Sequence, residues 1–178
     1  MIKGKTPSEL SCGMTFAPHT SWRTIISMSP DTLFLICNYA VIPAWLLLAV
    51  APHWFWTQRI IHAAWIPMLL TVVYIFMLVS GDAPEGASFG TLEGVMLFFT
   101  IPEATLAGWV HYLAFDLFIG AWQVRDARRR GIRHIYVVPC LFFTLMTGPV
   151  GLSLYLILRL ALRRTAAFAE TEYAAPAA

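Results

Sequence analysis

The stretch TLAGWVHYLAFDLFIGAW, from Thr105 to Trp122, decides how this chain folds. It is long and apolar enough to cross a bilayer, since a membrane-spanning helix needs about 20 mostly apolar residues at a rise of about 1.5 Å each. Yet it carries His111 and Asp116 near its middle. An aspartate at the centre of such a helix costs roughly 3 kcal/mol to insert, so a chain that keeps one normally has a partner or a function for it. We therefore expect the functional site on this helix.

The composition of the whole chain indicates an integral membrane protein. Of its 178 residues, 58% are hydrophobic and 12% are charged, whereas soluble proteins carry about 25% charged residues. The mean hydropathy is +0.68. The net charge of +2 is small and the arginines cluster at helix ends, a distribution typical of membrane topology and not of nucleic-acid binding. We expect one membrane domain in contact with the lipid bilayer and no nucleic-acid partner.

Four apolar blocks predict an all-α integral membrane protein, a bundle of four transmembrane helices. The spans are expected at about residues 32–50, 60–80, 103–124 and 135–160. A shorter apolar segment at 88–101 comes before the third span, and its length predicts a short interfacial or re-entrant helix. The membrane domain then covers residues 30–164, between polar tails at 1–29 and 165–178 that we expect to be disordered.

The last block has two interpretations, because Gly148-Pro149 interrupts it. A single kinked span is favoured over a helix that breaks into two half-helices, since a membrane tolerates broken backbone only where protein buries it. Five arginines between residues 125 and 133 place that loop in the cytoplasm, and four spans then place both termini outside. The arginines near the C-terminus disagree with this orientation, and a re-entrant last block would resolve the conflict. Arg159, near the end of the span, is expected to extend towards the headgroups.

One face of the third helix gathers polar and aromatic residues that we expect to point into the bundle. Its members, three, four or seven residues apart, are Thr105, Trp109, Tyr112, Asp116 and Gln123. His111 lies five residues before Asp116, a rotation of about 140° at 3.6 residues per turn. The two residues therefore do not share a face. They either flank a groove from two sides or contact different neighbours.

Structural roles explain these residues as well as catalytic roles do. Asp116 can hydrogen-bond a polar residue on a neighbouring helix, and His111 can be a packing residue. The polar neighbours considered are Asn38, Tyr39 and Tyr74. Glu103 lies at the start of the third helix, where an acid complements the helix dipole. The sequence contains no hydrolase, metalloprotease or nucleotide-binding motif and its three cysteines form no CxxC pair, so we expect neither a metal nor a cofactor.

Several short motifs are spread along the chain. They are WVHYLAFDLF (Trp109–Phe118), RH (Arg133–His134) after a charged loop, CLFF (Cys140–Phe143), GPVG (Gly148–Gly151), VAP (Val50–Pro52) and LEGV (Leu92–Val95). Together these motifs resemble the neoxanthin-synthase-like family. The resemblance covers about residues 31–162, and Trp-x-His with Asp-Leu-Phe is its most specific part. Plant members of this family are four-span plastid membrane proteins required to convert violaxanthin into neoxanthin. The resemblance therefore implies a four-span fold and a carotenoid or other hydrophobic polyene as ligand.

This sequence departs from the plant pattern in two ways. Its loop RDARRRGIRH (Arg125–His134) is more basic, and it shows no plastid transit segment. We therefore expect a bacterial relative in the inner (cytoplasmic) membrane, where violaxanthin is not an expected substrate. The reaction implied by the family isomerises an epoxide to an allene with a tertiary alcohol. Such a reaction requires a general acid and a base in a water-poor groove.

On this interpretation Asp116 is the acid and His111 the base, or the reverse, with Glu103 as a further catalytic candidate. The residues expected to bind the substrate are Trp109, Tyr112, Asn38 and Tyr74. The alternative is a non-catalytic carotenoid-binding or scaffold protein, because no established catalytic spacing occurs in the sequence. The sequence assigns neither the lipid nor the oligomeric state.

Overall fold

The computed structural model describes residues 28–164, and every regular element in this part of the chain is helical. The elements are α1 (Pro30–Val50), the one-turn π-helix η2 (Thr57–Ile61), α2 (Trp65–Ser80), α3 (Leu92–Phe98), α4 (Pro102–Arg129), α5 (His134–Thr147) and α6 (Pro149–Arg163). The predicted all-α fold is thus confirmed for these residues. The tails predicted at 1–29 and 165–178 lie outside the described residues, apart from Met28 and Ser29.

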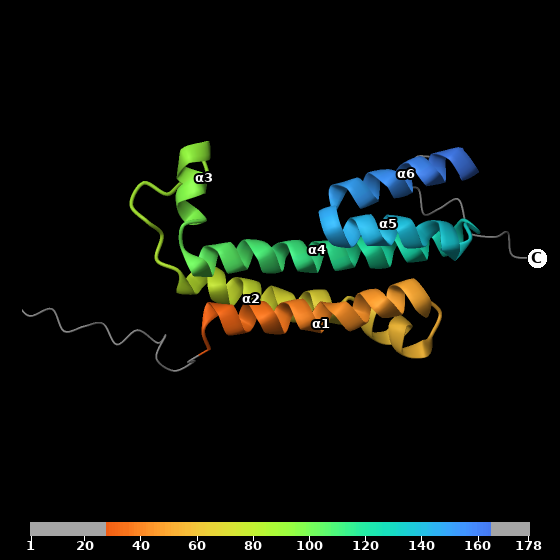
Figure 1. Ribbon diagram of the computed structural model, residues 1–178, viewed down its shortest axis with the longest axis horizontal. Helices are drawn as coiled ribbons and strands as arrows, with labels where there is room; N and C mark the ends of the chain where they lie inside the picture. The colour runs from red at the N-terminus through yellow and green to blue at the C-terminus, as the bar shows by residue number, and fades with distance from the viewer. Residues whose placement is uncertain (1–27, 165–178) are drawn as a thin grey trace, which may run out of the picture.

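Helix α4 is the axis of the molecule, and the other long helices pack along it (Figure 1). Helices α1 and α2 lie along one side, whereas α5 and α6 cover the C-terminal half of the other side. Fully buried apolar side chains join them, including Leu48 of α1, Leu117 of α4 and Val137 of α5. Gly120 lets α1 approach α4 closely, because a Cβ at this position would lie 2.7 Å from the Trp45 ring.

Local sequence explains where the helices begin. The Ser29 hydroxyl oxygen accepts a hydrogen bond from the Thr32 backbone N–H at 3.2 Å, and Asp31 lies in the first turn of α1. Helix α4 likewise opens with Pro102 and Glu103. The short helix expected within 88–101 is α3, whose first turn is capped by the side chain of Thr91.

The last apolar block forms two helices, so its interpretation as a single kinked span is wrong and the broken alternative is observed. Gly148 separates α5 from α6 with φ +43°, a conformation that costs side-chain-bearing residues energy. Pro149 then opens α6 at a position that needs no backbone donor. The two helices fold back side by side (Figure 1). Gly151 permits this contact, because a Cβ there would overlap the Thr144 backbone.

This hairpin of α5 and α6 brings the end of the described chain back to the arginine-rich loop. Arg163 of α6 donates a hydrogen bond to the carbonyl of Gly131, just after α4. The arginines of both segments therefore lie at one end of α4. The conflict between the two arginine clusters in the four-span topology disappears in this arrangement.

Helices α1 and α4 are long and apolar enough to cross a bilayer by length and composition, and α2 and α5 are apolar but shorter. With 14 and 15 residues, α5 and α6 are each roughly 21–23 Å long, less than a hydrocarbon core of about 30 Å. The number of crossings stays a prediction. We now expect the α5–α6 hairpin, in place of the fourth span, to enter and leave the membrane on the same face.

Candidate functional site

Asp116 lies near the middle of α4, at the tip of the α5–α6 hairpin. A Cβ on Gly148 would lie 2.6 Å from the Asp116 Oδ1 atom, so the hairpin turn rests directly on the carboxylate. The Oδ2 atom is buried and has no hydrogen-bond partner among the described residues. Helix α6 starts at Pro149, directly after Gly148, and the partial positive charge of its N-terminus favours a carboxylate at this position.

Tyr112, one helical turn before Asp116, joins the same site. Its hydroxyl donates a 2.6 Å hydrogen bond to the Leu145 carbonyl of α5, and it lies close enough to the Asp116 carboxylate for an electrostatic interaction between the two groups. A phenol beside a half-buried carboxylate is an arrangement that can pass a proton between the two groups.

Two further predicted residues continue from Tyr112 towards the start of α4. The Trp109 ring packs on the Tyr112 ring with centroids 5.4 Å apart, and its Nε1 donates a 3.2 Å hydrogen bond to Asn38 Oδ1 of α1. We call Asn38, Trp109, Tyr112 and Asp116 the α4 stripe. The structure thus brings together four of the residues that the sequence predicted for catalysis or binding.

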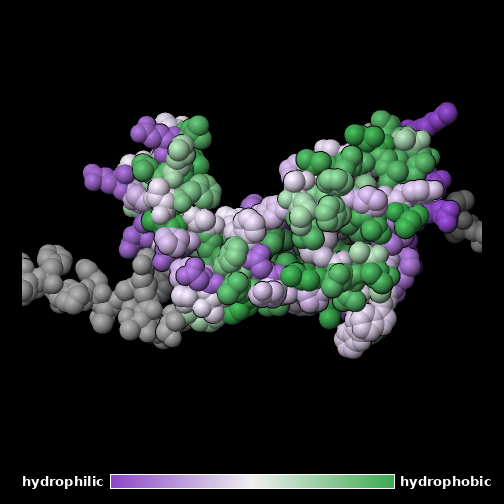
Figure 2. Space-filling view, viewed as in Figure 1, coloured by the Kyte–Doolittle hydropathy of each residue, from purple (hydrophilic) through white to green (hydrophobic). Residues whose placement is uncertain are grey.

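A cavity of about 350 Å³ adjoins the Trp109 end of the stripe. It lies between the first turns of α1 and α4, and Asp31 and Thr105 contribute polar atoms to its wall. Figure 2 shows a separate hollow of the surface over α4, between α3 and the hairpin. The α4 stripe therefore runs from the open cavity at Trp109 to the half-buried side chain of Asp116.

His111 points to a different neighbour. Its ring packs against Phe115 of α4 and Tyr74 of α2, with centroids 4.5 and 5.6 Å away. His111 and Tyr74 line a cavity of about 150 Å³ with aromatic side chains of α3 and its C-terminal flank. The sequence left two arrangements of His111 and Asp116 open. In the structure the two residues contact different neighbours and do not flank one groove.

Glu103 is also remote from Asp116. It lies in the first turn of α4, where its Cβ is 3.5 Å from the position of a Cβ on Gly81, at the end of α2. This location agrees with the alternative that the acid complements the helix dipole.

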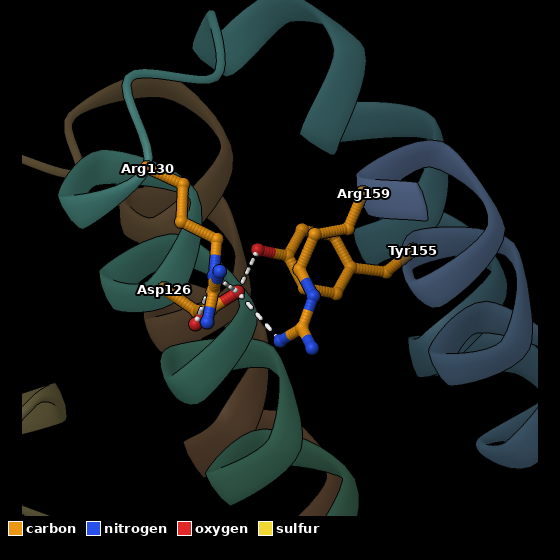
Figure 3. A network of polar contacts seen from close by, with 4 residues as sticks. All are labelled: Asp126, Arg130, Tyr155 and Arg159. Atoms are coloured by element: carbon orange, nitrogen blue, oxygen red, sulfur yellow. Dashed lines mark hydrogen bonds and ion pairs between the residues drawn. The ribbon is translucent and has the colours of Figure 1, made fainter. Parts of the chain in front are cut away.

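A second polar cluster, which the sequence did not predict, links the ends of α4 and α6 (Figure 3). The Asp126 Oδ2 atom accepts a 2.6 Å hydrogen bond from the Tyr155 hydroxyl and a 3.2 Å bond from Arg159 Nη1. Arg130 Nε lies 2.9 Å from Oδ1 of the same carboxylate. Arg159 is 0% exposed, so the expectation that it extends to the headgroups is wrong.

One sequence signal pointed to this cluster. Asp126 is the acid within a run of arginines, four residues before Arg130 and therefore on the same helix face. Nothing in the local pattern identified Arg159 or Tyr155, because their contact with Asp126 depends on the hairpin fold. Below the cluster, Gln123 and Thr144 form a further buried hydrogen bond of 2.9 Å between α4 and α5.

Among residues 28–164 there is no group of three His, Cys, Asp or Glu side chains placed to hold a metal ion. The fold and the site so far define a helical protein with membrane-length helices and a half-buried aspartate halfway along the central one.

The chain belongs to the ABA DEFICIENT 4-like family, whose profile matches residues 32–155. This confirms the family resemblance of the sequence motifs. One relative of this chain is Protein ABA DEFICIENT 4, chloroplastic, of Arabidopsis thaliana, which is 26% identical over 141 residues. The match covers 74% of this chain and 62% of that protein, so the chain spans less than two thirds of its relative. No solved structure matches the chain.

Proposed function

We propose that this protein is an integral membrane isomerase of a carotenoid or related polyene lipid, with Asp116 and Tyr112 as its proton-transfer pair. The observation that carries the proposal is the half-buried side chain of Asp116, whose buried Oδ2 atom has no hydrogen-bond partner among the described residues and which lies one helical turn from Tyr112. A chain rarely keeps an acid at this depth without a function for it. Family membership supports the carotenoid class of ligand.

The reaction that fits this pair is the opening of an epoxide next to a polyene. The carboxylate of Asp116 removes a vinylic proton, the C–O bond breaks, and the Tyr112 hydroxyl supplies a proton to the oxygen. The proton on Asp116 then returns to the Tyr112 oxygen. The product is an allenic alcohol with the same atoms as the substrate, so the reaction consumes no oxidant or reductant.

The position of the pair also favours such chemistry. Tyr112 and Asp116 lie between α4 and the hairpin, where few water molecules compete for the proton. A long apolar ligand could approach through the Trp109 cavity and lie along the α4 stripe. His111 has no part in this proposal, since its ring faces Tyr74 and Phe115.

A second candidate function is a non-catalytic carotenoid-binding or scaffold protein. The separation of His111 from Asp116 favours it, because the acid–base pair expected from the sequence is not assembled. The two candidates differ in whether the α4 stripe changes the ligand or only holds it.

We further propose that the protein lies in a bacterial cytoplasmic membrane with its arginine-rich end in the cytoplasm. Support comes from the arginines of the 125–133 loop and of the α6 end, which the hairpin places together. The loop between α2 and α3, with Asp82 and Glu85, lies at the opposite end of the molecule.

The test is expression of the full chain in a carotenoid-producing bacterium supplied with an epoxy-carotenoid, followed by pigment analysis and immunoblotting of the same cells. Asp116→Asn and Tyr112→Phe are expected to lower conversion by roughly 10²–10⁴-fold at normal protein level. His111→Gln is expected to retain conversion.

Two control variants match these changes in chemistry. Glu85→Gln makes the same acid-to-amide change in an exposed loop, and Tyr39→Phe removes an exposed phenol. Normal conversion by both stripe variants would overturn the catalytic proposal. Pigment that co-purifies with the wild type but remains unchanged would then favour the binding protein.

A further inference from the structure

A cavity of about 310 Å³ lies at the arginine-rich end of the molecule, apart from the α4 stripe. Its polar wall consists of His53, Arg128, Arg133 and His134, and its floor of buried Val124, Ala127 and Ile132. We call it the basic cavity. None of the described residues that line it is acidic. Its volume is about ten times the ~30 Å³ share of one water molecule, so it has room for more than a single small ion.

The positive charge of the basic cavity is not neutralised by the buried cluster nearby. Asp126 bonds Arg130 and Arg159 on the face of α4 that contacts α6. Arg128 lies two residues further along the helix, rotated by about 200° from Asp126. The other acids of the described chain lie at mid-helix or at the opposite end, namely Asp31, Asp82, Glu85, Glu93, Glu103 and Asp116.

The start of α5 adds a second feature that favours an anion. No side chain caps this helix, and its first turn contains no acid. The N–H groups of an uncapped first turn and the positive end of the helix dipole together form a site suited to phosphate. His134, the first residue of α5, donates from Nε2 to the Ala49 carbonyl at 2.9 Å and so holds this helix start against the end of α1.

The surroundings of the basic cavity indicate its depth in the membrane. Trp54 and Trp56 follow His53 and are exposed, and tryptophan rings favour the headgroup region of a bilayer. A phosphate at this depth belongs to a lipid rather than to the bulk solution. Arginine guanidinium groups bind phosphate oxygens through two parallel N–H donors, a geometry that lysine does not offer.

We propose that the basic cavity binds the phosphodiester headgroup of an anionic phospholipid, held by Arg128, Arg133 and the first turn of α5. The bound headgroup would join the ends of α1, α4 and α5. This inference does not depend on the proposed isomerase activity, because the basic cavity shares no residue with the α4 stripe.

The test measures lipid binding to the purified full-length protein by native mass spectrometry in a neutral detergent. Phosphatidylglycerol and phosphatidylcholine serve as probes, and thermal unfolding with inorganic phosphate tests a soluble ligand. We expect phosphatidylglycerol to bind more tightly than phosphatidylcholine. The double variant Arg128→Gln/Arg133→Gln should weaken phosphatidylglycerol binding by roughly 10- to 30-fold, since each basic residue contributes about fivefold near an anionic lipid.

A matched double variant removes the same charge at the same end of the molecule. Arg59 and Arg164 are exposed and do not line the basic cavity, so Arg59→Gln/Arg164→Gln should leave binding within about twofold of the wild type. Equal losses in both double variants would overturn the proposal, as would equal binding of the two lipids by the wild type. Stabilisation by inorganic phosphate without a preference for phosphatidylglycerol would overturn the assignment to a lipid.

Discussion

Replacing Asp126 by alanine should destabilise the protein more than any other single change in the buried cluster. The carboxylate accepts bonds from Arg130, Tyr155 and Arg159, and Arg159 is 0% exposed. Removing one partner of a buried ion pair typically costs about 3–5 kcal/mol, because the remaining charge stays buried. Asp126→Ala removes the shared partner of two buried arginines, so we expect a loss in the upper part of this range.

Tyr155→Phe provides a graded comparison. It removes one 2.6 Å hydrogen bond to a charged group but leaves both arginines paired with the carboxylate. Such a bond contributes about 1.5–3 kcal/mol, so the loss should be clearly smaller than for Asp126→Ala. The double variant Asp126→Ala/Arg159→Met should lose less free energy of unfolding than the sum of the losses in its two single variants. The reason is that each single variant leaves the charge of Asp126 or Arg159 buried without the other, whereas the double variant removes both charges.

The assay is reversible unfolding in mixed micelles with increasing SDS, followed by tryptophan fluorescence and circular dichroism. Glu85→Gln, in an exposed loop, is the control and should change the free energy of unfolding by less than about 0.5 kcal/mol. A value for Asp126→Ala within about 1 kcal/mol of the wild type would refute the reasoning, because the cluster would then not hold α6 against α4.

Two more predictions concern the hairpin. Gly148→Ala should lower the free energy of unfolding by about 2–4 kcal/mol in the same SDS titration, because φ is +43° and the new Cβ would lie 2.6 Å from Asp116 Oδ1. Gly90→Ala is the matched control, since no atom lies within 4 Å of its added Cβ. Equal stability of the two variants would contradict the prediction. The second prediction concerns single cysteines introduced at Arg129, Arg164 or Glu85 in a background without native cysteines. Cysteines at positions 129 and 164 should react with an impermeant thiol reagent from one side of the membrane, and a cysteine at position 85 from the other side. Reaction of position 164 from the same side as position 85 would show that the last block crosses the bilayer.

The sequence predicted those parts of the structure that depend on neighbours along the chain. The start of α4 was predicted from Glu103 in its first turn, because a helix terminus is fixed by its own first residues. Ser29, which caps α1, lay in the predicted N-terminal tail. The stripe of Trp109, Tyr112 and Asp116 followed from the helical period alone.

The break in the last block was visible as Gly148-Pro149, but its consequence was not. Both a kinked helix and a hairpin are compatible with these two residues. The choice depends on Gly151, which lets α5 and α6 touch, and on contacts with α4 that no local pattern contains.

Sequence by itself therefore determined the helical class, the family, the apolar composition and the position of a costly acid in the central helix, since each is a property of composition or of residues within one or two turns. Tertiary structure decided which groups meet. It separated His111 from Asp116 by turning them to different helices, and it buried Arg159 against Asp126 across 33 residues of chain. Such pairings depend on how helices pack in three dimensions, and helical periodicity specifies the face of a residue but not the partner that covers it.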